Sequence, residues 1–236
     1  MSVTMAIARR ELGAYFRSPL AYVITAAFLV IAGYFFSVNV IFSRQATVRP
    51  LFQTMYTILL LIAPMVTMRL LAEEQKSGTI ELLLTSPVRD LEVVLGKFLA
   101  GLGFFAAMLA LTLYYPFLLR MYGNPDTGGI VGGYLGALLF CGAIVAVGLF
   151  TSSLTQNQIV AAVLAFAILL LLWVIDGLSS VFGGRIGDAL QYLALFPHFN
   201  DMTRGAIDTK DVMYYLTVIL AALFLTWRSL EARRWR

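Results

Sequence analysis

Apolar residues gather in six long runs along the chain, and charged residues fall mainly in the intervals between these runs. A helix needs about 20 residues to cross a bilayer core about 30 Å thick, and the runs approach or exceed that length. The pattern therefore predicts an all-α, polytopic membrane protein with six transmembrane helices in one domain over residues 1–236. The predicted spans are residues 20–42, 51–71 and 98–119, two helices within the charge-free interval 127–175, and residues 212–227.

Local sequence features refine these spans. Pro64 lies within the second span and predicts a kink there, which a membrane helix tolerates. The polar stretch "TSSLTQNQ", residues 151–158, divides the charge-free interval into the fourth and fifth spans. The sixth span has only 16 uncharged residues, so Asp211 and Arg228 are expected to reach toward the headgroups at its two ends.

Residues 1–18 show the periodicity of an amphipathic helix. The apolar face comprises Met5, Ala8, Leu12, Tyr15 and Phe16, and the opposite face comprises Arg10, Gly13 and Arg17. This arrangement is typical of a helix that lies flat in the membrane interface. Pro19 then marks a turn into the first span.

The composition confirms the membrane assignment and narrows the partners. The chain is 60% hydrophobic and 13% charged, whereas soluble domains are about one quarter charged. Its mean hydropathy is +0.85. The formal net charge is +4, and the basic residues cluster beside the apolar runs. Such clusters indicate topology signals and anionic lipid headgroups, so membrane lipids are expected as partners and nucleic acid is not.

The distribution of Lys and Arg predicts the orientation. With the N-terminus in the cytoplasm, eleven of the 17 basic residues fall on the cytoplasmic side. Basic residues are enriched in cytoplasmic loops, so the sequence predicts that both termini are cytoplasmic. The charged segment 73–90, between spans two and three, is then also cytoplasmic. The segment 179–210, between spans five and six, lies outside.

The segment 73–90 contains a short amphipathic helix of its own. Ile80, Leu83 and Leu84 follow helical spacing, and Gly78 and Pro87 bracket them. A free helix of about two turns is marginal in water, so it needs a surface to lie against. That surface is either the bilayer and the neighbouring spans or a groove in a soluble partner, and periodicity does not choose between them.

The outer segment 179–210 is too long for a passive connector. Ile186, Ala189, Leu190 and Leu193 share one helical face within it. One or two amphipathic or re-entrant helices are therefore expected to cap the membrane domain from outside.

Sequence motifs for nucleotide binding and catalysis are absent. The chain has no Walker A pattern, so it is not expected to bind nucleotide phosphates itself. The glycine-rich stretch that contains Gly128, Gly132 and Gly136 has the spacing of close helix packing. Cys141, the single cysteine, is expected to be a packing residue, and no metal site is predicted.

The remaining polar residues have structural explanations. His198 has no second His or Cys nearby and is expected at the surface or the interface. Ser152 and Ser153 would need a base within the membrane for protease chemistry, and His198 is expected on the opposite side. Asp176 ends the fifth predicted span and is expected to reach the outer headgroups.

The string "EEQKSGTIELLLTSPV" between spans two and three resembles the signature of ABC-2 type transporter permeases. The resemblance extends along the chain through "RREL", "SPLAYV" and the outer segment "FPHFNDMTRGAIDTKDVMYYL". It is most similar to the gliding-motility and copper-enzyme-maturation branch. The resemblance implies one permease domain, multi-pass, in a bacterial inner membrane.

The resemblance also implies roles for named residues. Segment 73–90 would be the coupling helix that an ATP-binding subunit grips, and residues 151–158 would form a minor cytoplasmic contact. The expected coupling residues are Glu73, Glu74, Gly78, Thr79, Ile80, Glu81, Leu83, Leu84 and Pro87, and the minor-contact residues are Thr151, Gln156 and Asn157.

The leading hypothesis is the permease subunit of an ATP-driven exporter of an amphipathic or lipid-like cargo. The expected partners are two ATP-binding subunits, which would carry ATP and Mg²⁺, a second permease copy or a homologue, and an accessory outer-face protein. No cofactor is expected in this chain, which is not itself an enzyme. The expected pathway residues are Thr25, Ser37, Asn39, Gln53, Thr54 and Thr57. The alternatives are an ion-gradient-driven secondary transporter, for which Asp176 is the candidate acid, and a membrane scaffold.

Overall fold

The structure, a computed structural model, describes residues 2–43, 45–79 and 88–234. Within these residues the chain is helical and has no strand. The helices are α1 (Val3–Arg17), α2 (Pro19–Ser43), α3 (Arg49–Thr67), α4 (Arg69–Ser77), α6 (Asp90–Leu111), α7 (Tyr114–Tyr122), α8 (Thr127–Leu154), α9 (Gln158–Phe182), α10 (Gly184–Leu193), α11 (Leu195–Thr203) and α12 (Thr209–Arg234).

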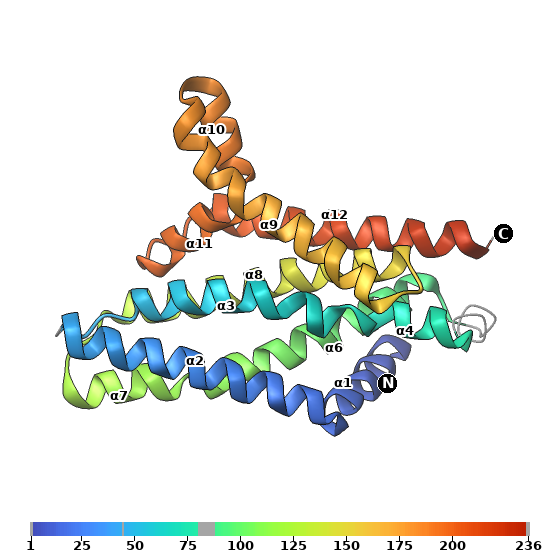
Figure 1. The fold of residues 1–236 in the computed structure, drawn as a ribbon, viewed down its shortest axis with the longest axis horizontal. Helices are drawn as coiled ribbons and strands as arrows, with labels where there is room; N and C mark the ends of the chain where they lie inside the picture. Colours follow the sequence, from blue (N-terminus) through green and yellow to red (C-terminus); the bar gives the residue numbers. More distant parts are fainter. Residues whose placement is uncertain (1, 44, 80–87, 235–236) are drawn as a thin grey trace.

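Six stretches of helix in the described residues are long and apolar enough to cross a membrane, as the sequence predicts. They are Pro19–Ser43, Arg49–Ser77, Asp90–Tyr122, Thr127–Leu154, Gln158–Ser179 and Thr209–Ala232. Figure 1 shows both chain termini at the same end of the helix bundle, as an even number of crossings requires. We call this end, which also holds α1 and α4, the terminal end, and we call the opposite end, which holds α7, the distal end. The all-α, six-span fold class is therefore confirmed.

The second span is broken between α3 and α4 at Met68, four residues beyond Pro64. The kink at Pro64 stays a prediction. The helix continues through Pro64, and the Met68 N–H still donates to the Pro64 carbonyl at 3.0 Å. The third span breaks between α6 and α7 at Thr112 and Leu113. Pro116 has no N–H to donate to the Thr112 carbonyl, which accepts from Tyr115 N–H at 3.0 Å instead.

The third and sixth spans begin earlier than the charges suggest. We expected span three from residue 98, because Lys97 would lie in water, but α6 begins at Asp90 and Lys97 is 1% exposed. We expected Asp211 to reach the headgroups, but it is fully buried. Both predictions were wrong because each charge has a partner inside the protein: Glu74 for Lys97 and His198 for Asp211.

Helix α8 is the centre of the bundle and packs against α3, α6, α9, α11 and α12. Its glycines allow the close approach that the sequence predicts. A Cβ at Gly132 would collide with the Met202 carbonyl of α11, and one at Gly136 would lie 3.1 Å from the Met202 Cβ. Further along α8, a Cβ at Gly148 would collide with the Thr67 side chain of α3.

Helix α1 forms as predicted. Its apolar face packs partly against the protein, whereas we expected it to lie against the membrane interface. It lies against α6, where Ile7 contacts the Cα side of Gly96, and it buries Ala8 and Tyr15. Met5 and Phe16, which we placed on the same apolar face, are exposed. The N-terminal helix is therefore part of the bundle at the terminal end.

The segment 179–210 contains two short helices, α10 and α11, and the presence of helices there agrees with the prediction. Their location outside the membrane stays a prediction. Figure 1 shows α10 projecting away from the bundle together with the end of α9, whereas α11 folds back along it. α10 packs on α9 and α11 packs on α8. The apolar side chains Ile186 and Leu193 of α10 remain exposed.

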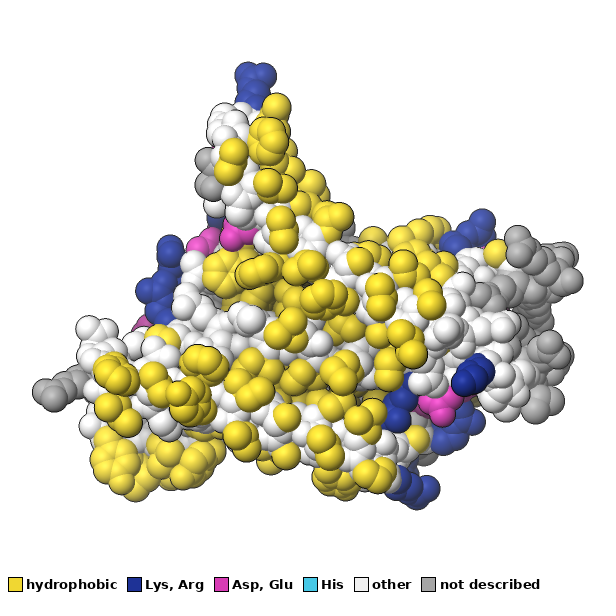
Figure 2. All heavy atoms as spheres, viewed as in Figure 1, with side chains coloured by type: hydrophobic (Ala, Val, Ile, Leu, Met, Phe, Trp, Pro, Cys, Tyr) yellow, Lys and Arg dark blue, Asp and Glu magenta, His cyan; other side chains and the backbone are white. Residues whose placement is uncertain are grey.

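Hydrophobic side chains cover most of the side of the bundle in Figure 2, whereas charged side chains gather toward its margins. This is the distribution expected of a protein whose sides face lipid and whose ends face water.

Gly148→Ala should destabilise the protein by about 1–3 kcal/mol, because the added methyl group meets Thr67 in a packed interface. Gly13→Ala on α1 is the matched control, since nothing lies within 4 Å of the added carbon. Thermal unfolding in detergent compares the two. Equal transition temperatures for Gly148→Ala and Gly13→Ala would contradict the close contact between α3 and α8.

Candidate functional site

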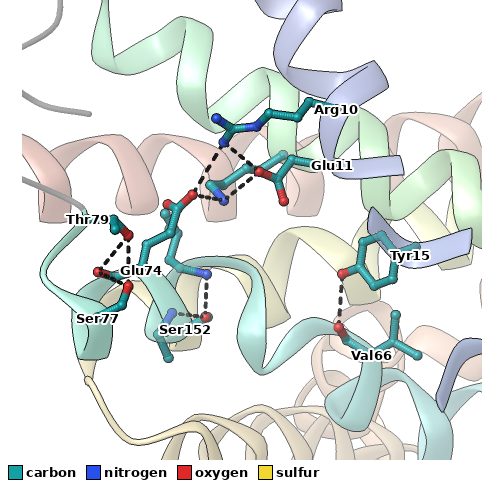
Figure 3. A network of polar contacts seen from close by, with 11 residues as sticks. Arg10, Glu11, Tyr15, Val66, Glu74, Ser77, Thr79 and Ser152 are labelled. Atoms are coloured by element: carbon teal, nitrogen blue, oxygen red, sulfur yellow. Dashed lines mark hydrogen bonds and ion pairs between the residues drawn. The ribbon is translucent and has the colours of Figure 1, made fainter. Parts of the chain in front are cut away.

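The candidate site lies at the terminal end of the bundle, where α4 meets α1, α6 and α8. The site begins at the break before α4, because the first N–H groups of a helix have no carbonyl partners within that helix. The Ser152 hydroxyl of α8 accepts hydrogen bonds from the N–H groups of Leu71 and Ala72, both at 2.9 Å. It donates its own proton to the Met68 carbonyl at 2.8 Å. One buried hydroxyl therefore caps α4 and joins it to α8 (Figure 3).

A second contact ties the middle of α4 to the C-terminal turn of α8. The buried amide of Gln75 donates to the carbonyls of Ser152 and Ser153, at 3.3 and 3.0 Å. These carbonyls lie in the last turn of α8, where carbonyl groups have no N–H donor from their own helix. The short helix α4 is therefore held along its length by α8.

A network of four charged residues joins α4 to α1 and α6. Lys97 Nζ of α6 lies 2.9 Å from Glu74 Oε1 and 3.6 Å from Glu11 Oε1. Arg10 lies 2.9 Å from Glu11 and 3.7 Å from Glu74 (Figure 3). The two acids are each less than one fifth exposed, and the formal charges of the four groups sum to zero.

Burial makes Lys97 the decisive member of this network. Removing an ammonium group from water costs several kcal/mol unless opposite charge and hydrogen bonds compensate. Two carboxylates from two other helices provide that compensation. Because Lys97 remains buried only when all three helices are in place, it fixes α1 and α4 relative to α6.

Tyr15 makes a further contact between α1 and the end of α3. Its hydroxyl donates to the Val66 carbonyl at 3.0 Å (Figure 3). Its ring stacks on Phe104 of α6 with centroids 5.2 Å apart. The Arg69 guanidinium lies 5.1 Å from the ring centroid. Burial raises the pKa of Tyr15, so its hydroxyl remains a neutral donor.

The chain leaves this site at the end of α4 and returns at the start of α6. Gly78 adopts a φ of 71°, the left-handed conformation that favours glycine at a helix end. The hydroxyls of Ser77 and Thr79 lie 2.8 Å apart beside it (Figure 3). On return, the Arg89 N–H donates to Glu92 Oε2 at 3.0 Å. The segment 80–87 thus starts and ends on two helices that Lys97 and Glu74 join.

The structure separates the predicted coupling residues into three groups. Ile80, Glu81, Leu83, Leu84 and Pro87 lie outside the described residues. Glu73, Gly78 and Thr79 are exposed. Glu74 instead faces inward and pairs with Lys97.

The residues of the predicted minor contact also divide. Thr151 is buried and donates to the Gly148 carbonyl, so its side chain is enclosed by this chain. Gln156 and Asn157 are exposed between α8 and α9, and Asn157 accepts from Ile159 N–H to cap α9. These two residues are accessible from the terminal end.

The predicted pathway residues do not come together as one set. Gln53 and Thr57 of α3 line a hollow of about 560 Å³ between α3, α9 and α11. The other four are not among its lining residues, and two of them bond to their own helices: Thr54 to the Pro50 carbonyl and Asn39 to the Phe35 carbonyl. Thr25 and Ser37 lie on α2.

We expected His198 at the surface or the interface, but the structure encloses it within the protein. Its ring is buried, with Nδ1 2.7 Å from Asp211 Oδ1 and Nε2 3.0 Å from the Tyr192 carbonyl. It stacks on Tyr214 with centroids 4.1 Å apart. His198 therefore joins α11 to α12 and is far along the chain and the fold from Ser152, which serves as a helix cap.

The sequence reasoning missed Glu11, Lys97 and Ser152 as members of this site. Lys97 was interpreted as the edge of a span and Ser152 as part of a polar break. A weak signal existed, because Lys97 falls seven residues after Asp90 within an apolar helical pattern and is thus inside α6.

Among the described residues, six helices long and apolar enough to cross a membrane, with a buried polar network where the second and third spans meet, define an all-α multi-pass membrane protein. The sequence profile of the family described as ABC-2 family transporter protein matches residues 5–229. The chain belongs to this family, and is therefore a multi-pass membrane component of a transporter. No curated protein individually matches the sequence.

Lys97→Ala should destabilise the protein by about 3–5 kcal/mol, because two carboxylates would lose the buried cation that compensates them. Arg10→Ala removes a charge from the same network at a position that is largely exposed, and it should cost about 1 kcal/mol or less. Reversible unfolding in a detergent titration measures both. The double variant Lys97→Met with Glu74→Gln should recover part of the loss.

If Lys97→Ala and Arg10→Ala prove equally mild, the buried network does not hold the three helices together. The same conclusion follows if the Lys97→Met and Glu74→Gln effects simply add, since residues in contact are expected to couple.

Proposed function

We propose that this chain is the permease subunit of an ATP-driven exporter and that a separate ATP-binding subunit grips segment 73–90. The observation that carries the proposal is the set of buried polar contacts at the terminal end, made by Lys97, Glu74, Glu11 and Ser152, which we call the clamp. Thr79 and Val88, the described residues on either side of segment 80–87, adjoin α4 and α6, which the Lys97–Glu74 pair joins, and α4 is also fixed to α8 by Ser152. A force that the ATP-binding subunit applies to this segment would therefore be transmitted to α4 and α6.

The family membership supports the presence of an ATP-binding partner, because the permease itself has no Walker A pattern. Glu73, Gly78 and Thr79 are exposed at the end of α4, where such a partner would first meet the chain. Gln156 and Asn157 would form the minor contact. Closure of the motor on ATP would tilt α3 and α6 through the clamp.

The exposed apolar faces support a paired permease and an amphipathic cargo. Only 17% of the most apolar window of α2, and 17% of that of α9, is buried in the single chain, against 61–67% for the spans that contain α3, α6 and α8. A second copy or homologue would cover part of α2 and α9. A lipid-like cargo would enter the interface between the two permeases from the bilayer. A bacterial inner membrane is the setting that we propose.

Thr79→Cys tests the partner directly. Cys141 is buried, so a maleimide–benzophenone crosslinker should label the introduced thiol selectively. After illumination in native membranes, mass spectrometry should identify a crosslinked protein that contains a Walker A pattern. Asp188→Cys on exposed α10 is the matched control and should give no such product.

Replacing both Glu81 and Leu83 by Ala should weaken binding of the ATP-binding subunit about tenfold or more, because a few anchor residues dominate such interfaces. Membrane insertion should be unchanged. Transport and nucleotide hydrolysis that are both indifferent to these substitutions would refute the coupling role. Transport driven by an ion gradient without ATP would instead support a secondary transporter.

A further inference from the structure

The hollow between α3, α9 and α11 is a second candidate site, separate from the clamp at the terminal end. Its volume is about 560 Å³, and it is lined by Gln53, Thr57, Trp173, Val174, Asp176, Gly177 and Phe196. Gln53 and Thr57 lie one turn apart on α3. Trp173, Asp176 and Gly177 lie at helical spacing on α9, so each helix presents one face to the hollow.

Asp176 lies within the membrane-spanning part of α9, and α9 continues beyond it to Phe182. We expected Asp176 to end the fifth span, but the span continues beyond it to Ser179. Asp176 comes about 18 residues after the start of α9, which corresponds to roughly 27 Å along the helix axis. The carboxylate is therefore close to the distal end of the span, and the hollow is lined in part by exposed apolar residues such as Val174.

The chemistry of the lining residues favours a cation. Asp176 is the one charged residue of the lining set, and it takes part in none of the ion pairs between described residues. A carboxylate at the edge of the hydrocarbon region and beside apolar side chains is stabilised by a partner of opposite charge. A bound cation would provide that partner.

The surrounding groups favour an organic cation over a metal ion. No group of three or more His, Cys, Asp or Glu residues among those described could hold a metal ion. Trp173 and Phe196 instead provide aromatic rings, which attract ammonium groups through their faces. The Thr57 hydroxyl donates to the Gln53 carbonyl and keeps its oxygen available as an acceptor.

We propose that this hollow binds the ammonium headgroup of an amphipathic cation whose tail remains in the bilayer. Asp176 neutralises the headgroup, Trp173 and Phe196 contact it through their rings, and Gln53 and Thr57 orient it. This inference rests on the proposed export function for its biological meaning, since it assigns the charge class of the cargo. The binding itself requires no ATP-binding subunit.

Quenching of Trp173 fluorescence tests the proposal. The full chain with Trp227→Phe and Trp235→Phe keeps one of its three Trp residues, and nanodiscs of digalactosyldiacylglycerol provide an uncharged bilayer. The probes are 11-bromoundecyltrimethylammonium and the uncharged 11-bromoundecanol, which share a quenching bromine and an undecyl chain. The cation should quench saturably, whereas the alcohol should quench only in proportion to its concentration in the membrane.

Asp176→Asn should weaken binding of the cation about tenfold or more, because it removes the compensating charge. Asp176→Glu should retain binding, and Asp188→Asn on exposed α10 should leave it unchanged. Hexadecyltrimethylammonium, a non-quenching amphipathic cation, should compete when added to the nanodisc, whereas water-soluble tetramethylammonium at the same effective amount should not. This pair separates a membrane-borne headgroup from a soluble ammonium ion.

Unchanged binding in Asp176→Asn would overturn the proposal, and so would saturable binding of the alcohol with equal affinity. Equal competition by tetramethylammonium would refute the requirement for a tail. Because no nucleotide or partner is present, a negative result here leaves the crosslinking of Thr79→Cys unaffected. A negative crosslinking result likewise leaves the quenching measurement unaffected, so the two failures are distinguishable.

Discussion

The buried ammonium group of Lys97 is the constraint on which the terminal end of this protein depends. It is 1% exposed, and its charge is balanced only when Glu74 of α4 and Glu11 of α1 approach it together. A buried charge with one partner missing is far less stable than the complete set. Lys97 therefore makes the positions of α1, α4 and α6 interdependent, and Ser152 extends the same assembly to α8 through the three hydrogen bonds that cap α4.

This assembly would allow a separate ATP-binding subunit, as proposed above, to move the membrane helices of a chain that has no nucleotide-binding motif of its own. A short polar segment can transmit force to membrane helices only if its two ends are rigidly attached to them. Here α4 and α6 supply the attachments, and Gly78 ends α4 by a conformation that redirects the chain. At the other end of the bundle, α11 is fixed by the buried His198–Asp211 pair, and the hollow that contains Asp176 lies between α11, α9 and α3. The two ends thus have separate polar sites, joined by the central helix α8 and its glycines.

The six spans, the presence of short helices in segment 179–210 and the close approach at Gly132 could be predicted, because hydrophobic length, helical periodicity and small-residue spacing depend on local sequence. The site at the terminal end could be predicted only in part. A rule that assigns charges to water places Lys97 and Asp211 at span ends, and it fails wherever a partner from a distant helix compensates the charge. The α3–α4 break at Met68 was not predicted either, because the Ser152 hydroxyl that caps α4 lies more than 80 residues along the chain. Such contacts between distant residues have no signature in a single sequence.

If a separate ATP-binding subunit drives this chain, as we propose, the central claim is that α1, α4 and α6 move as one body. Spin labels on Arg9→Cys and Lys76→Cys, two exposed positions on α1 and α4, measure it by pulsed electron–electron double resonance in the complex with the ATP-binding subunit. Dilution with unlabelled permease isolates distances within one chain. The account predicts a narrow distance distribution that is unchanged by nucleotide, while the distance between Lys76→Cys labels on paired permeases shifts. A nucleotide-dependent change within one chain as large as the change between chains would contradict it.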